Sequence, residues 1–172
     1  MHHLSSGLKE AMRKVPSAVA LVTGRDESGQ PHGMAASAVI SVSVDPPSML
    51  VAVNRTAGLY PVVEATRRLC LNFLAQHHEH LLEPFSRSDM RGQRFVSPEW
   101  ADVEPSAPGR LPWLPNACAV VCGEVDKAVP YGTHTLFIVR VLDVLRPQEL
   151  PMECQPMVWL EGRSAPLAPV AA

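Results

Sequence analysis

The sequence lacks an excess of basic residues and any long apolar run. Its 172 residues include 15 Lys and Arg against 17 Asp and Glu, so the formal net charge is −2. Phosphate neutralisation needs a clear surplus of Lys and Arg, so nucleic acid is not expected as a partner. No apolar run approaches the roughly 20 residues of a membrane-spanning helix, and the first residues do not follow the order of a signal peptide. We therefore expect a cytoplasmic protein without a membrane partner.

Several motifs that carry chemistry are absent too. The sequence has no Gly-x-Gly-x-x-Gly, no Gly-x-x-x-x-Gly-Lys and no Gly-x-Ser-x-Gly. The four cysteines form no Cys-x-x-Cys pair, which argues against zinc, and in a reducing compartment we expect free thiols: Cys70, Cys118, Cys122 and Cys154. Because no set of acid, base and nucleophile stands out, a bound cofactor would have to carry any catalysis.

The composition itself is that of an ordinary globular protein, with 47% hydrophobic and 19% charged residues. A chain of this length suits one domain and can bury roughly two thirds of its unfolded surface. We expect a single domain over residues 1–172. Its core should run from about residue 8 to 163, and the small, proline-containing tail 164–172 should fray.

The order of apolar runs predicts a mainly β protein with a few helices. Helices are expected near the start, capped by Ser6 and ended by Pro16, and over residues 58–67 and 76–85. The early strands follow one another as hairpins without helices between them. This favours an antiparallel sheet or barrel over the βαβ units of a dinucleotide fold. The expected strands cover residues 18–23, 31–44, 49–53, 69–75, 117–129, 134–145 and 157–160.

Two polar regions leave alternatives open. Residues 87–115 are proline-rich and charged, which is typical of a functional or partner-covering loop, or of partial disorder. His77 and His80 lie three apart on one helical face and could supply two metal ligands. No third ligand is apparent, so we favour a solvated helix surface without metal.

Cys118 and Cys122 share one strand face and are interpreted as small core residues.

Several segments between residues 8 and 163 follow one another in the order of a known family. They are Pro31-His32-Gly33-Met34-Ala35-Ala36-Ser37 with Val44-Asp45-Pro46-Pro47, Val53-Asn54-Arg55-Thr56 with Tyr60, Leu71-Asn72-Phe73-Leu74, Phe85-Ser86 with Arg94-Phe95, Gly132-Thr133-His134-Thr135-Leu136-Phe137-Ile138, and Trp159-Leu160-Glu161-Gly162-Arg163. In this order they resemble the short-chain flavin reductases with the FMN-binding split-barrel fold. These proteins are the reductase components of two-component flavin-dependent monooxygenases.

The resemblance implies an antiparallel, Greek-key-like split β-barrel with NAD(P)H:flavin oxidoreductase activity. Such an enzyme transfers a hydride from NADH or NADPH to FMN or FAD and supplies reduced flavin to a separate oxygenase. It also implies a homodimer with flavin near the interface. Hydride transfer requires the nicotinamide and flavin rings to stack at reacting distance, so the protein must hold the flavin with one face open.

The resemblance also indicates which residues contact the flavin ring. Small residues let the backbone come close to a flat ligand, and the first matching segment has several of them. Two aromatic residues of later segments are expected to contact the cofactor as well. The full set expected at the ring is Gly33, Met34, Ala35, Ala36, Ser37, Tyr60 and Phe85.

The remaining site residues have competing interpretations. Asn54, Arg55 and Thr56 leave a strand and enter a helix, which suits a phosphate site, although Asn54 and Thr56 would also serve as helix caps. By resemblance His134 is the catalytic residue, placed near the nicotinamide; otherwise it is a surface turn histidine. Arg163 either contacts the cofactor or pairs at a subunit interface.

The sequence departs from the family at several of these positions. Ala35 and Ala38 stand where the family often has hydroxyl residues, and Thr133 replaces the usual Asp beside His134. Each lost hydroxyl removes a hydrogen bond worth roughly 0.5–1.5 kcal/mol. Two other functions therefore remain open. One is a non-catalytic flavin-binding or accessory protein, and the other is an enzyme that uses bound flavin for a different redox step.

Overall fold

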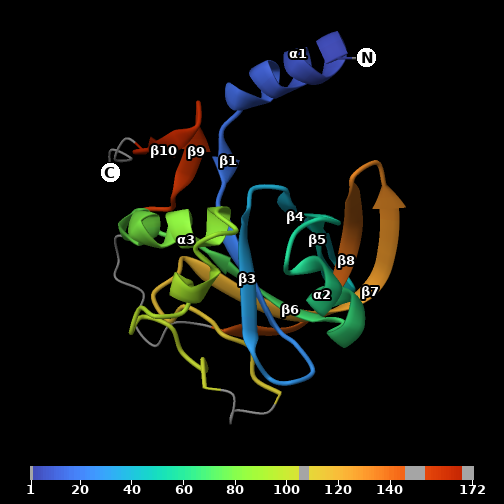
Figure 1. The fold of residues 1–172 in the computed structure, drawn as a ribbon, viewed down its shortest axis with the longest axis vertical. Helices are drawn as coiled ribbons and strands as arrows, with labels where there is room; N and C mark the ends of the chain where they lie inside the picture. Colours follow the sequence, from blue (N-terminus) through green and yellow to red (C-terminus); the bar gives the residue numbers. More distant parts are fainter. Residues whose placement is uncertain (1, 105–108, 146–153, 168–172) are drawn as a thin grey trace.

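The computed structural model describes residues 2–104, 109–145 and 154–167, and antiparallel strands dominate it (Figure 1). One sheet has seven strands in the order β3-β2-β6-β7-β8-β5-β4, and a second has three in the order β1-β9-β10. The strands are β1 (Ser17–Ala18), β2 (Ala20–Arg25), β3 (Pro31–Ala36), β4 (Val39–Val44), β5 (Pro47–Asn54), β6 (Arg68–Phe73), β7 (Ala119–Tyr131), β8 (His134–Leu145), β9 (Val158–Leu160) and β10 (Arg163–Ala165). The helices are α1 (His2–Arg13), α2 (Tyr60–Thr66), α3 (Leu82–Ser86) and the short 3-10 helices η1 (Gln76–Leu81) and η2 (Arg91–Gln93). The mainly β, antiparallel prediction is confirmed.

The seven-stranded sheet closes on itself at a short corner. β3 and β4 lie at opposite ends of the strand order, yet only residues 37–38 connect them. The corner also pairs with the sheet, because the N–H of Ala52 donates to the carbonyl of Ala38 at 3.0 Å. Edges joined by so short a link must come together, so the sheet curves into a barrel. The segment 31–44, predicted as one extended piece, is thus divided into two strands.

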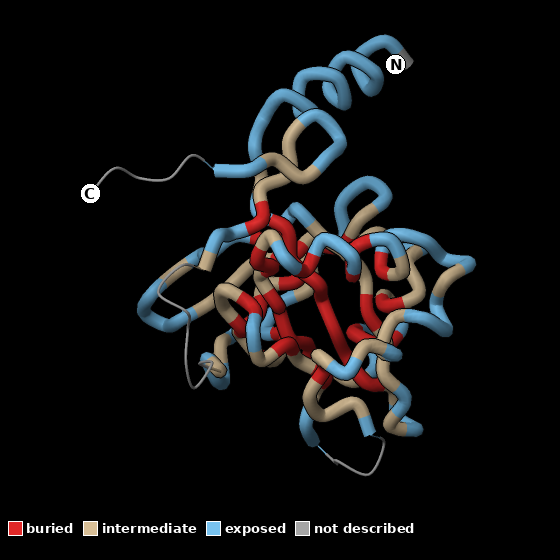
Figure 2. Tube along the Cα trace, turned by 90° about the vertical axis from the view of Figure 1, so that its left-hand side faces the viewer, coloured by how far each residue is buried: buried red, intermediate tan, exposed pale blue. Residues whose placement is uncertain are grey.

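The central strands β2 and β6 separate two hydrophobic clusters. Val22 and Leu71 pack with Phe137 in a cluster shared with β5 and β8, whereas Leu21 and Cys70 pack under the segment 74–117. Successive side chains of a strand point to opposite faces, so a strand that is covered on both sides reads as a continuous apolar run. Figure 2 shows the resulting band of buried chain through the middle of the molecule.

The described part of the proline-rich stretch packs onto the protein's own barrel. Trp100 and Leu114 are buried in the second cluster, and the backbones of Ala101 and Trp113 bond to each other at 2.9 and 3.2 Å. The buried Arg25 of β2 also holds this stretch, since its guanidinium donates to backbone carbonyls of residues 104 and 110. Residues 105–108 lie outside the described part.

The expectation of four free thiols is wrong, because Cys118 and Cys154 form a disulfide. Both cysteines are carried to the end of β6 by backbone pairing. The N–H of Cys118 donates to the carbonyl of Phe73 at 2.8 Å, and the N–H of Met157 donates to that of Leu74 at 2.9 Å. The two sulfurs therefore meet although they are 36 positions apart. Cys70 and Cys122 are free.

Both ends of the described chain differ from prediction. Ser6 does not cap α1 but lies inside it, and its hydroxyl donates to the carbonyl three residues earlier. At the other end, Ser164 and Ala165 pair with β9 in strand β10, where fraying was expected, and residues 168–172 lie outside the described part. α1 projects from the body (Figure 1), and its apolar Leu8 and Met12 are exposed. No helix of the described residues has the length and apolarity needed to cross a membrane.

Candidate functional site

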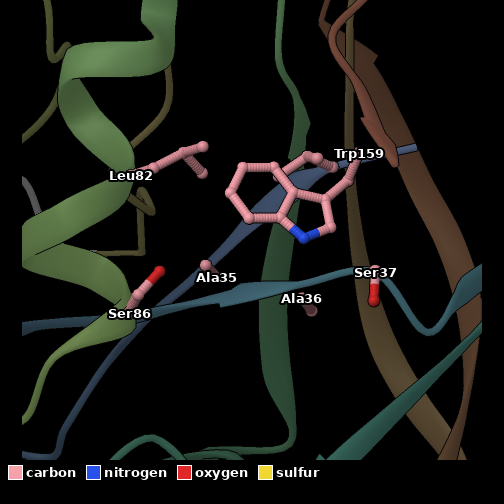
Figure 3. Close-up of a pocket in the computed structure, with 7 residues that line it drawn as sticks. Ala35, Ala36, Ser37, Leu82, Ser86 and Trp159 are labelled. Atoms are coloured by element: carbon pink, nitrogen blue, oxygen red, sulfur yellow. The ribbon is translucent and has the colours of Figure 1, made fainter. Parts of the chain in front are cut away.

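Two adjoining cavities run along β3 and together form one groove. The first has a volume of about 190 Å³ and lies between β3, α3 and Trp159 of β9 (Figure 3). The second has a volume of about 300 Å³ and lies between β3, η2 and the loop that follows β5. Ala35 and Ser86 line both cavities, so the two cavities lie next to each other. We call the first the aromatic half of the groove and the second its cationic half.

Small side chains make the floor of the aromatic half. Ala35, Ala36 and Ser37 line it from β3 and the corner that follows, and Trp159 and Leu82 line it from the other sides. Among the described residues, no ionisable side chain lines this half. Such a surface suits a flat, uncharged part of a ligand.

α3 is pressed closely against β3, and this contact fixes one wall. A Cβ atom at Gly33 would lie 2.5 Å from Cε1 of Phe85, so only glycine permits this approach. Phe85 is buried and packs against the rings of Phe95 and Trp100, each with centroids 5.3 Å away. Phe85, which was expected at the flavin ring, lines the cationic half of the groove.

Arg94 holds the same wall in place. Its guanidinium donates to the carbonyls of Gly33 at 2.6 Å, Pro84 at 2.8 Å and Arg87 at 3.0 Å. It also lies 5.8 Å from the centre of the Phe85 ring. Burial, followed by the nearby charge of Arg91, lowers the pKa of Arg94. Arg94 therefore ties α3 and η2 to β3, and its donors are used by the protein itself.

Arg91 is the exposed cation of the groove. Its guanidinium lies over Gly58, where an added Cβ would come within 2.9 Å of Nη2. Thr56, Ser86 and Ser88 line the same cavity with hydroxyl groups. No carboxylate of the described residues lines either half of the groove. The exposed guanidinium of Arg91 and the hydroxyl residues around it make this half a suitable site for a phosphate or another anion.

The turn at Asn54 does not form the helix cap that was one of its two interpretations. Oδ1 of Asn54 accepts hydrogen bonds from the N–H and the hydroxyl of Thr56, both at 2.9 Å. α2 begins only at Tyr60, so these residues close the turn rather than cap the helix. Arg55 donates to the carbonyl of Gly132. Of the three predicted phosphate residues, only Thr56 lines the groove.

Three further predicted residues do not line the groove. His134 begins β8 directly opposite Asn54, and its Nδ1 lies 2.9 Å from the hydroxyl of Thr133. Tyr60 packs against Phe137, with ring centroids 6.0 Å apart, and accepts a hydrogen bond from Thr135 at 3.5 Å. Arg163 is exposed on β10. Of the predicted cofactor residues, Gly33, Met34, Ala35, Ala36, Ser37, Thr56 and Phe85 line the groove.

Several residues that line the groove were not predicted from the sequence. Leu82, Ser88 and Arg91 lie outside the matched segments, so no sequence signal pointed to them. Ser86, Arg94 and Trp159 do lie within segments that resemble the family, and this could have nominated them.

Comparison with known proteins identifies the family. The model of the flavin reductase like domain matches residues 12–168, which is most of the chain. The chain belongs to this family. The resemblance noted in the sequence is thereby confirmed, and so is the split-barrel fold.

Relatives of this flavin reductase-like chain cover nearly all of its length. The FMN reductase (NADH) RutF of Cronobacter sakazakii is 33% identical over 90% of this chain and 88% of its own. The actinorhodin polyketide dimerase of Streptomyces coelicolor is also 33% identical, over 95% of this chain and 87% of its own. A solved structure, BorF, the flavin reductase component of a bacterial two-component tryptophan halogenase, superposes with a TM-score of 0.79. It is 25% identical and covers 95% of this chain and 99% of its own.

In the described part of the chain, no three His, Cys, Asp or Glu side chains, those of the histidine segment included, are grouped so that they could hold a metal ion. His77 and His80 are exposed, as the solvated-surface interpretation predicts, but His78 is fully buried. Its Nδ1 accepts the N–H of Ala75 at 3.1 Å, and its Nε2 lies 3.8 Å from Oε2 of Glu99. Burial, followed by the charge of His77, lowers the pKa of His78 to about 4.

Proposed function

We propose that this protein is an NAD(P)H-dependent flavin reductase that binds FMN or FAD, reduces it with NADH or NADPH, and passes reduced flavin to a separate oxygenase. Family membership supports this proposal, and the two unlike halves of the groove carry it. Flavin mononucleotide combines an uncharged three-ring system with a phosphate, and the groove combines a charge-free half with a cationic one. The relatives are described as an NADH-dependent FMN reductase and as the reductase component of a halogenase.

Different residues of the groove would contact the ring and the phosphate of the cofactor. Ala35, Ala36 and Ser37 would lie along the ring, and backbone groups of small residues can approach it closely. Arg91 and Thr56 would hold the phosphate. A bound flavin supplies the capacity to take up a hydride from a nicotinamide. The protein's part is to fix the ring and to leave one of its faces accessible.

A comparison of FMN with riboflavin tests this arrangement, because riboflavin lacks the phosphate. Arg91→Ala should weaken FMN binding by about 10-fold to 100-fold, as expected for the loss of a charge-assisted contact. It should leave riboflavin binding unchanged. Arg140→Ala is the matched control, since this exposed arginine pairs with Glu124 at 2.9 Å and does not line the groove. Equal binding of FMN to the wild type and the Arg91→Ala variant would exclude the cationic half as the phosphate site.

His134 is proposed to contact the nicotinamide at the rim of the groove. Its support is its place opposite Asn54, two residues before the groove-lining Thr56. His134→Ala should raise the KM for NADH or lower kcat in an assay with added FMN. Unchanged steady-state kinetics would remove His134 from the reaction.

A homodimer belongs to the same proposal. Leu4, Leu8 and Met12 form an exposed apolar stripe on α1, which is unfavourable in water unless it is covered. Light scattering during gel filtration should give twice the mass of one chain. A stable monomer at micromolar concentration would contradict the dimer.

A second candidate is an enzyme that uses bound flavin to act on another organic substrate. It is favoured by the polyketide dimerase, which is as similar in sequence as the FMN reductase. NADH oxidation with free FMN as the sole acceptor separates the candidates. Turnover supports the reductase, and binding of FMN without turnover favours the second candidate.

A further inference from the structure

We propose that Trp159 is the flavin-stacking wall of the groove, the aromatic plane that positions the ring system over residues 35–37. This inference rests on the proposed flavin binding and extends it to a residue on the second, three-stranded sheet. Trp159 is half-buried and lines the aromatic half from β9. Figure 3 shows its indole reaching across the groove above Ala35 and Ala36, with Leu82 on one side and Ser37 on the other.

The backbone of Trp159 is held from both sides. It is paired with Ser17 of β1 and with Ser164 of β10, so it sits on the central strand of its sheet. Two residues earlier, Met157 is buried and bonded to the carbonyl of Leu74. The strand therefore presents the indole to the groove from a fixed position, which limits the entropy that is lost on stacking.

The floor of the aromatic half, which lies opposite Trp159, lacks an aromatic residue. Ala35, Ala36 and Ser37 offer a nearly flat surface, and Leu82 and Val19 are aliphatic. Trp159 is the only aromatic side chain among the described residues that line this half. Phe85 lines the cationic half instead, and its ring is already packed against the rings of Phe95 and Trp100. A planar ring in the aromatic half would therefore have one available π partner, and stacking on it is favourable.

The absence of charge around the indole supports the same assignment. No ionisable residue of the described chain lines the aromatic half, whereas Arg91 and Arg94 line the other. A ligand with a charged and an uncharged end would thus enter in one orientation. Its uncharged rings would then lie against Trp159.

Flavin binding to variants of Trp159 tests the proposal, with both FMN and riboflavin as probes. Trp159→Ala should weaken binding of both ligands by the same factor, about 5-fold to 100-fold, because stacking does not involve the phosphate. Trp159→Phe should restore most of the affinity. This pattern differs from that of Arg91→Ala, which should affect FMN alone.

Fluorescence provides a readout that does not depend on turnover. An indole stacked on a flavin quenches flavin emission, so bound FMN should be brighter in Trp159→Ala than in the wild type at saturation. Trp113→Phe is the matched control, because the indole of Trp113 donates to Asp102 at 3.0 Å and does not line the groove. Val158→Ala controls for loosening of β9, since the neighbouring side chain points to the other face of the strand.

The sign of the effect decides between stacking and obstruction. Tighter flavin binding by Trp159→Ala would mean that the indole fills the place of the ring, and this would overturn the proposal. Unchanged affinity for both ligands, or an equal loss in Val158→Ala, would overturn it as well. A wild type that binds neither FMN nor riboflavin would instead refute the proposed function.

Discussion

The seven-stranded barrel and the three-stranded sheet each supply one wall of the groove, but they are held together in different ways. Every residue of β2 is buried, whereas β1, β9 and β10 contain no buried residue. The small sheet depends on ties at its margins, such as the Cys118–Cys154 disulfide and the backbone bond from Glu161 to Arg13 at 2.8 Å. The side of the groove formed by the barrel is therefore held by a hydrophobic core. The side formed by the small sheet is held by a disulfide and a few backbone hydrogen bonds.

The two sheets should differ most in the free energy of unfolding that is lost when one apolar side chain is removed from each. Phe137 is fully buried in the barrel, and Phe137→Ala should lower the free energy of unfolding by about 3–5 kcal/mol. Leu160 of β9 is only half-buried, so Leu160→Ala should cost about 1 kcal/mol. Urea denaturation of the two variants measures both values. Equal losses would show that the small sheet has a core of its own.

Loss of the disulfide should be the next largest effect. The bridge joins residues 36 apart, and a closed loop of this length is expected to stabilise by about 3–4 kcal/mol. Reduction of the wild type with a dithiol should lower the free energy of unfolding by this amount. A Cys118→Ala/Cys154→Ala double variant is the control and should not respond to the dithiol. A wild type that is equally stable with and without reductant would contradict a structural role.

Acid should weaken the junction between the two sheets through His78. This histidine accepts the N–H of Ala75, and Ala75 pairs with Pro156 just before β9. The pKa of His78 is lowered from 6.5 to about 4 in the folded protein, so between these values the unfolded state binds more protons. The contribution of neutral His78 to the free energy of unfolding is complete above pH 6.5 and is lost as the pH falls towards 4. The total loss is up to about 3 kcal/mol.

Denaturation curves between pH 4 and pH 8 measure this effect. The difference in stability between the wild type and His78→Gln should shrink as the pH falls, because the variant does not titrate there. A difference that stays constant with pH would assign the acid sensitivity to groups other than His78.

The smallest effect is expected for the projecting helix. Leu8 is 64% exposed, so Leu8→Ala should change the free energy of unfolding of a single chain by no more than about 0.5 kcal/mol. Thermal unfolding at several protein concentrations measures this. A larger, concentration-dependent loss would show that a second copy covers the helix.

Local sequence patterns predicted much of the barrel but little of the way in which the groove is assembled. Alternating and continuous apolar runs located β5, β7 and β8 because burial of a strand face imposes its own period. The burial of His78 and the pairing of Cys118 with Cys154 depend on contacts between distant segments, which no local pattern encodes. Trp159 reaches the groove for the same reason: its place is set by pairing with β1 and β10.

The corner at residues 37–38 has a consequence for redesign of this protein. Ser37 lines the aromatic half of the groove, and it is also one of the two residues that connect the edge strands of the barrel. An insertion there would alter ligand shape selectivity and separate the barrel edges at the same time, so the two properties could not be tuned independently. Substitutions at Leu82, which lies on α3 outside the barrel strands, would reshape the same cavity without changing the connection between β3 and β4.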